Sequence, residues 1–219
     1  MQKKIKNWEE LINDGENYGE QDIAYSPMEK KIIENVKDKT VLKIQDCYAF
    51  IKTGEATPEH GRELARVITN FEPLKDISTL IITHNALGPE GVRIISESKN
   101  LPKVTYLHLG SNNLGDEGAE IVARAELFSE VKTLNLEYNG ITGRGGRALA
   151  ESPVLIQLES LNLVDNCLGD EGALAIADSD SLANLTYLHL GGNRVKSEAA
   201  KSALKESKKL SKLQTLKVF

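Results

Sequence analysis

The sequence predicts an α/β solenoid, a fold in which a short strand and a helix repeat along the chain. Asparagine recurs with a constant spacing of 27 residues, and an apolar pair of the form Leu-x-Leu or Leu-x-Ile precedes each copy at a fixed distance. Small and apolar residues with helical spacing follow each copy. The five asparagines are Asn85, Asn112, Asn139, Asn166 and Asn193.

The segment before each asparagine predicts a strand. In Leu107-His-Leu109-Gly-Ser-Asn112 the two leucines lie two residues apart, which is typical of a short strand with one buried and one solvated face. The asparagine amide can bond the backbone of the turn that leaves the strand, where those backbone groups have no ladder partner. We therefore expect the asparagines to form a structural ladder along the stack and not a binding site.

The segment after each asparagine predicts a helix. In the second full repeat, Ile121 and Val122 lie three and four residues after Gly118, a spacing that places these residues on one helical face. Gly115 suits the turn into this helix, and Gly118 suits close packing against the neighbouring helix. The acidic residues expected at helix N-termini, where they complement the helix dipole, are Asp116, Glu117, Asp170 and Glu171.

Both ends of the chain depart from the period. A degenerate first repeat, Leu42-Lys-Ile44-Gln-Asp-Cys47, has cysteine in the asparagine position and lies 38 residues before the next copy, 11 more than the period. Its helix is expected from Pro58 to Ile68, with Thr57 as the N-cap. We predict a helical N-terminal cap over residues 1–37. The repeat domain is predicted over 38–219, with one degenerate repeat, five 27-residue repeats and a terminal strand that starts at Leu213.

Three features near the ends of the chain lead to further predictions. The segment Ser26-Pro27-Met28-Glu29 indicates a capping box that opens a helix through Ile32, Ile33 and Val36. The insertion Tyr48-Ala-Phe-Ile-Lys-Thr-Gly54 predicts either a mobile contact loop on the rim or a segment packed under the cap. Lysines along the terminal strand favour a monomer, while a two-fold dimer through that edge is the alternative.

The frame Leu-x-Leu-x-x-Asn-x-Leu-Gly-x-x-Gly, with a helix in each unit, resembles the ribonuclease-inhibitor-like class of leucine-rich repeats over roughly residues 38–219. The resemblance implies a horseshoe with parallel strands on the concave face and helices on the convex face. The class includes ribonuclease inhibitors, activating proteins for the Ran GTPase, sensing regions of innate immune receptors, and effectors injected by intracellular bacteria. The low repeat count and unusual cap look more like a bacterial, effector-type member.

The composition of the chain indicates its cellular compartment and argues against some classes of partner. No stretch approaches the ~20 apolar residues of a membrane span, so we expect no membrane partner. Aromatic residues make up only 5% of the chain and no basic patch interleaves with them, which argues against nucleic acid. Cys47 and Cys167 form no paired spacing, which favours a reducing compartment. We therefore expect a cytoplasmic protein, or one delivered to a host cytosol without a classical signal peptide.

Strand residues that do not enter the core are expected to face the concave surface. Seven strands make this surface about 30 Å long, which suits a protein partner better than a small molecule. The candidate partner-binding residues are Tyr106, His108, Asn135, Glu137, Tyr138, Asn162, Asp165, Tyr187 and His189. Tyrosine is enriched at interface hot spots, although a strand surface also favours aromatic residues. His108 and His189 lie three repeats apart, roughly 14 Å, which is too far to share one metal ion.

No nucleophile–base pair or paired carboxylate emerges from the repeat frame, so we expect no catalytic residues, no metal and no cofactor. The segment Thr142-Gly-Arg-Gly-Gly-Arg147 starts a helix where sibling repeats carry acids. Its backbone N–H groups, with Arg144 and Arg147, can hold a phosphate or carboxylate; the other interpretation is a repeat that has drifted.

The sequence therefore favours a non-enzymatic protein–protein interaction module that recognises its partner through the concave face. The alternative, implied by the resemblance, is a GTPase regulator of the Ran-activating-protein type. Such regulators typically have more repeats and a long acidic tail, whereas this chain ends in a lysine-rich strand.

Overall fold

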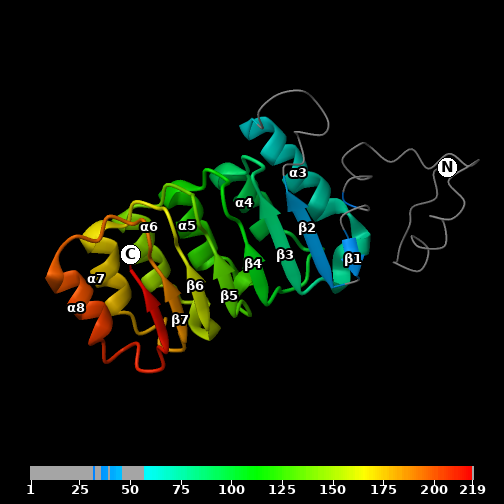
Figure 1. Cartoon of the computed structure of the whole chain (residues 1–219). Helices are drawn as coiled ribbons and strands as arrows, with labels where there is room; N and C mark the ends of the chain where they lie inside the picture. The colour runs from blue at the N-terminus through cyan, green and yellow to red at the C-terminus, as the bar shows by residue number, and fades with distance from the viewer. Residues whose placement is uncertain (1–31, 33–35, 39, 46–56, 219) are drawn as a thin grey trace, which may run out of the picture.

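The computed structural model describes residues 32, 36–38, 40–45 and 57–218. These residues form an eight-stranded sheet whose strands follow the order of the sequence, with helices along one side (Figure 1). The strands are β1 (Val36–Asp38), β2 (Val41–Gln45), β3 (Thr79–Thr83), β4 (Tyr106–His108), β5 (Thr133–Asn135), β6 (Ser160–Asn162), β7 (Tyr187–His189) and β8 (Thr215–Lys217). The helices are α3 (Pro58–Asn70), α4 (Gly88–Ser96), α5 (Gly115–Arg124), α6 (Gly143–Ala150), α7 (Gly169–Ala177) and α8 (Glu198–Lys205). Three 3-10 helices are η2 (Glu72–Asp76), η3 (Glu126–Phe128) and η4 (Leu155–Gln157).

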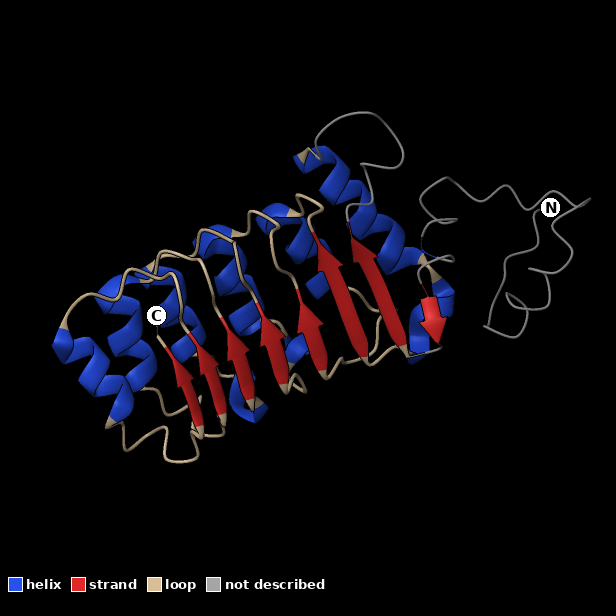
Figure 2. Cartoon of the chain, viewed as in Figure 1, coloured by secondary structure: helices blue, strands red, loops and turns tan. Residues whose placement is uncertain are grey.

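Strands β2 to β8 all run parallel (Figure 2). From β3 to β7 each strand is followed by a helix that returns the chain before the next strand, which is the connection that parallel pairing requires. This architecture confirms the predicted α/β leucine-rich-repeat solenoid.

Period-two alternation divides each strand between two surfaces. Residues such as Leu107 and Leu134 are fully buried in the core beneath the helices, whereas their strand neighbours Tyr106 and His108 are half-buried. We call the side of the sheet opposite the helices the sheet face, and the outer side of α3 to α8 the helix face. The sheet face is the surface on which the candidate partner-binding residues of the strands are expected to lie.

The asparagine ladder is confirmed. Asn139 is buried and its Oδ1 accepts hydrogen bonds from the backbone N–H of Asn112 at 3.0 Å and of Leu114 at 3.3 Å. Its Nδ2 donates to the carbonyls of Leu109 and Leu136 at 2.9 and 3.0 Å. The amide therefore joins its own turn to the preceding repeat, and it satisfies backbone groups that the sheet leaves open.

The acids at the helix starts have a role that the repeat frame did not reveal. Asp116 opens α5, but its carboxylate accepts hydrogen bonds from the backbone N–H of Thr142 at 2.7 Å and of Gly145 at 3.0 Å, at the start of α6. Asp170 binds the residues just before α8, through the N–H groups of Lys196 and Ser197 at 2.7 and 3.1 Å. The Asp116 carboxylate thus satisfies an N–H group in the first turn of α6, beside the N-cap Thr142, and the Asp170 carboxylate holds the N-cap of α8, Ser197.

A second ladder, of serine hydroxyls, lies at the other end of the helices. Ser152 and Ser179 are buried, and each hydroxyl donates to a helix-end carbonyl of the preceding repeat, Ala123 and Ala150 respectively. The same hydroxyls accept the backbone N–H groups that open the next connection. The stack is therefore hydrogen-bonded between repeats at both ends of the helices.

At the N-terminal end, Thr57 caps α3 as predicted, and its hydroxyl accepts the backbone N–H of His60. The helix predicted through Val36 is wrong at that residue, because Val36 lies in β1, which pairs antiparallel with β2. Ile32 is helical and buried. Cys47, the insertion 48–54 and the capping box at 26–29 lie outside the described residues.

At the C-terminal end, β8 pairs with β7 on one side. Its inward residue Leu216 and the preceding Leu213 are only partly buried, while Val218 is nearly covered. The described residues place no strand on the outer edge of β8.

Candidate functional site

The sheet face carries two columns of side chains in continuous register. The first column joins Val41, Thr79, Tyr106, Thr133, Ser160, Tyr187 and Thr215 across seven neighbouring strands. The second joins Lys43, Ile81, His108, Asn135, Asn162, His189 and Lys217. This register confirms that six of the nine candidate residues occupy adjacent positions on one surface.

Aromatic contacts gather near the C-terminal end of the sheet face. The rings of Tyr187 and His189 meet edge to face, with their centroids 6.3 Å apart. Lys217 Nζ lies 5.6 Å from the centroid of the Tyr187 ring, within the range of a cation–π interaction. The pKa of His189 is lowered, first by burial and then by the positive charge of Lys217. This imidazole is therefore neutral at pH 7.

Polar contacts connect β4, β5 and β6 at the centre of the sheet face. Glu137 Oε2 accepts a hydrogen bond of 2.8 Å from Asn162 Nδ2, and Glu137 Oε1 lies 3.4 Å from His108 Nε2. That imidazole nitrogen is buried, and it makes no hydrogen bond with the described residues. Burial lowers the pKa of His108 despite the nearby carboxylate, so the imidazole is uncharged at pH 7.

Asn135 and Asn162 also serve the turns that follow their strands. Asn135 Oδ1 accepts the backbone N–H of Glu137 at 3.0 Å, and Asn162 Oδ1 accepts that of Val164 at 3.1 Å. Their side-chain oxygens are therefore committed to the scaffold, while Asn162 Nδ2 holds Glu137.

Tyr138 and Asp165 stand where the chain leaves β5 and β6. Both have left-handed backbone conformations, with φ of 52° and 51°. The Tyr138 side chain is 56% exposed, the highest value among the large hydrophobic side chains that the structure describes. A hydrogen bond to Asp165, followed by the negative charge of that carboxylate, raises the pKa of the Tyr138 phenol.

The left-handed backbone belongs to the turn itself, because the equivalent residues His84 and Ser111 share it. A bulky side chain is uncommon in this conformation. Tyr138 gains little burial in return, so the fold gives no reason for a tyrosine at this position.

Glycine keeps the space beside these residues open. A Cβ atom on Gly110 would lie 2.8 Å from His108 Nε2 and 3.0 Å from Glu137 Cγ. A Cβ on Gly192 would lie 2.1 Å from Asp165 Oδ1. Either substitution would push the neighbouring side chain out of its present place.

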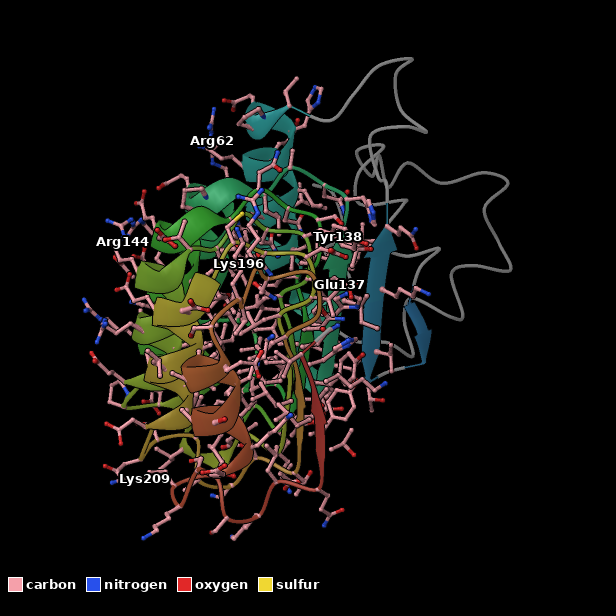
Figure 3. All side chains as sticks on the ribbon, turned by 60° about the vertical axis from the view of Figure 1, so that its left-hand side comes forward. Arg62, Glu137, Tyr138, Arg144, Lys196 and Lys209 are labelled. Carbon is pink, nitrogen blue, oxygen red and sulfur yellow. The ribbon has the colours of Figure 1, made fainter. Side chains whose placement is uncertain are left out.

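Arg144 and Arg147 lie on the other side of the molecule, on α6. Figure 3 shows Arg144 among the helices, while Glu137 and Tyr138 lie on the strand side. Arg144 Nε is 3.3 Å from Asp116, and Arg147 is 3.2 Å from Glu171. Because Asp116 also accepts N–H groups at the start of α6, this helix terminus already has a carboxylate, which argues against the anion site considered from the sequence.

Within the described part of the chain, no three histidine, cysteine or acidic residues gather as a metal site would require. No helix in that part is long and apolar enough to cross a membrane. Asn184 begins an Asn-Leu-Thr glycosylation sequon. Its Oδ1 accepts a hydrogen bond from Lys212 Nζ, and its Nδ2 donates to the carbonyl of Ile156.

Four segments of the chain match the family model Leucine Rich repeat: residues 100–123, 131–150, 157–177 and 181–202. Each segment contains one strand and all or part of the helix that follows it, from β4 with α5 to β7 with α8. Repeats of this kind generally mediate protein–protein interaction in non-enzymatic binding modules. No curated protein matches the chain.

Proposed function

We propose that this leucine-rich-repeat solenoid binds a protein partner across its sheet face. The observation that carries the proposal is the pair of columns in continuous register over seven strands. Strands stand ~4.8 Å apart, so the columns span about 30 Å. None of the described helices lies on this side of the sheet (Figure 2). A surface of this length and shape suits a protein and not a small ligand.

The chemistry of the columns supports the proposal. Tyr106 and Tyr187 occupy the same column, three strands or roughly 14 Å apart. Both are half-buried, so each ring is held by its neighbours and still offers apolar area and a hydroxyl to a partner. Tyrosines placed in this way dominate many interfaces.

The helix face offers the competing surface. A hollow of about 690 Å³ lies between α7 and α8, lined by Leu174, Ala203 and Lys208 among others. Leu174 is 45% exposed there, whereas the equivalent residues of the other repeats are charged, as Arg93, Glu120, Arg147 and Lys201 show. A single variant at Leu174 therefore tests this surface without touching the sheet face.

The experiment compares six proteins in capture from lysate, followed by affinity measurement with the captured partner. These are the wild type, Tyr106→Ala, Tyr187→Ala and the helix-face variants Leu174→Ala, Lys201→Glu and Lys205→Glu. We expect each tyrosine variant to lose ~1 kcal/mol or more of binding free energy, about a fivefold loss of affinity. Leu174→Ala should bind as the wild type does. If only Leu174→Ala, or only the helix variants Lys201→Glu and Lys205→Glu, weaken binding, the partner uses the helix face and the proposal is wrong.

The GTPase regulator makes a different prediction, since such a protein would accelerate GTP hydrolysis by its target. We expect no acceleration with candidate GTPases. Under our proposal the chain is a cytoplasmic, non-enzymatic binding module, and the ribonuclease-inhibitor-like class and effector-type origin are expectations from the sequence.

A further inference from the structure

Charge is organised differently on the two sides of the molecule. On the helix face, acids pair with basic side chains of the neighbouring repeat: Glu117 with Arg93 at 2.8 Å, Glu171 with Arg147 at 3.2 Å. On the sheet face, Glu137 and Asp165 follow adjacent strands, and neither carboxylate lies within ion-pair distance of a lysine or arginine among the described residues.

The partners of Glu137 leave its charge uncompensated. Asn162 donates one neutral hydrogen bond to it. Among the described residues, His108 is the basic side chain within ion-pair distance of it, and the neutral form of that imidazole predominates at pH 7 because burial lowers its pKa. The Glu137 side chain is still 30% exposed, so a partner can reach the carboxylate.

Asp165 and Tyr138 complete the same area. The Asp165 carboxylate lies near enough to the Tyr138 hydroxyl to raise the pKa of that phenol, and the tyrosine is largely exposed. Asp165 is exposed, and the adjacent Gly192 has no side chain that would cover it. The turns that carry these residues lie side by side, because the backbone N–H of Tyr138 donates to the carbonyl of Val164 at 3.0 Å. Two anionic groups and an exposed aromatic ring therefore lie on adjacent turns at the carboxyl ends of β5 and β6.

We propose that Glu137, Asp165 and the ring of Tyr138 receive one lysine or arginine side chain of the protein partner. The inference rests on the proposed function and names the chemistry of the partner at the centre of the sheet face. A cation gains charge-assisted hydrogen bonds from the carboxylates and attraction to the ring. The partner's cation would neutralise these carboxylates, as arginine side chains of the chain itself do for Glu117 and Glu171 on the helix face.

Lysines at the two ends of the sheet face limit how many positive charges the partner can carry. Lys43 and Lys217 are exposed in the second column, three strands from β5 and two strands from β6. At ~4.8 Å per strand these distances are about 14 and 10 Å. A single basic side chain flanked by neutral or acidic groups fits this pattern, whereas a long polybasic segment meets repulsion at both ends.

The test uses the full chain and a defined probe. N-acetyl-arginine methylamide is titrated into isotope-labelled protein, and backbone amide shifts are followed by NMR; N-acetyl-citrulline methylamide is the uncharged probe of matched shape. We expect saturable shifts at residues 136–139 and 163–166 with the arginine probe only. In Glu137→Gln/Asp165→Asn these shifts should require at least tenfold more probe. The control Glu117→Gln/Asp180→Asn removes the same charge from acids paired with Arg93 and Lys209, and it should respond as the wild type does.

Three results would overturn the inference: no saturable shift with the arginine probe, equal shifts with citrulline, or equal weakening in the control variant. Its failure is distinct from failure of the proposed function. If the captured partner loses affinity for Tyr106→Ala and Tyr187→Ala but binds Glu137→Gln/Asp165→Asn normally, the sheet face is the interface and the cation assignment is wrong. Both variants keep hydrogen-bonding side chains of the same shape, and an unchanged melting temperature shows that they fold.

Discussion

The helix face and the sheet face carry acids of the same kind but use them differently. Asp116 on the helix side accepts two backbone N–H groups of the next helix and pairs with Arg144. Glu137 on the sheet side receives one hydrogen bond from an amide side chain and no cation from the described residues. The first carboxylate is part of the structure. The second makes fewer contacts within the described chain, so we expect it to tolerate substitution better than the first.

The largest effect is expected in the asparagine ladder, inside one repeat. Asn139→Ala leaves buried N–H and carbonyl groups of two repeats unpaired, so it should lower the free energy of unfolding by about 1–3 kcal/mol. Asn135→Ala, four residues earlier on the sheet face, removes one half-buried contact and should cost less than half as much. Chemical denaturation of both variants measures the difference, and equal losses would contradict the structural role of Asn139.

The next effect concerns the cap between repeats. Asp116→Ala leaves the N–H groups of Thr142 and Gly145 at the start of α6 without their carboxylate and should destabilise the protein by about 1 kcal/mol, similar to the cost of a lost N-cap. Glu137→Gln should leave the unfolding free energy nearly unchanged. If Glu137→Gln were the more destabilising of the two, the division between the faces would be wrong.

The dependence of stability on acid pH tests the role of the Asp116 carboxylate on the helix face. Burial alone would raise the pKa of Asp116, but hydrogen bonds from Thr142 and Gly145 and the charge of Arg144 lower it overall. A carboxyl with a lowered folded-state pKa stabilises the protein above its unfolded pKa, and this contribution is lost as pH falls through the folded pKa. We therefore expect the difference in melting temperature between wild type and Asp116→Asn to shrink as pH falls from 5 toward about 3. A constant difference over that range would show that the charge is not involved.

The smallest effect is expected from the exposed ion pairs of the helix face. Glu117→Gln removes the partner of Arg93, yet both side chains are about half exposed. Such pairs contribute roughly 0–1 kcal/mol, so the melting temperature should change little. A loss larger than that of Asp116→Ala would mean that ion pairs, and not the cap, hold neighbouring helices together.

The repeat frame predicted most of the scaffold. The strands, the helix starts, the asparagine ladder and the register of the sheet-face columns all follow from residues inside one 27-residue unit. Gly115 and its equivalents have the positive φ values that the turn into the helix suggested. Local periodicity was sufficient because every unit solves the same packing problem.

Contacts between repeats were harder to predict. Asp116 reaches residues 26–29 positions ahead, and the Ser152 hydroxyl reaches Ala123, 29 positions back. Both depend on how far one unit is rotated against the next, which no single unit encodes. The recurrence of Ser152 and Ser179 at the period is the sequence signal for the serine contact. The helix predicted through Val36 was wrong for a similar reason, because the strand β1 depends on a contact outside its own segment. The open edge of β2 offers backbone hydrogen bonds to the residues beside it.

The antiparallel β1 gives the sheet a direction of growth. On the β2 side, the parallel order ends with a strand that runs the opposite way and occupies the hydrogen-bonding edge. On the β8 side, the edge keeps the parallel orientation of β2 to β7. We therefore expect that additional 27-residue modules can be spliced after β7 in frame, each bringing its own asparagine and serine. The same modules placed before β2 would have to displace β1, so the scaffold can be lengthened from one end only.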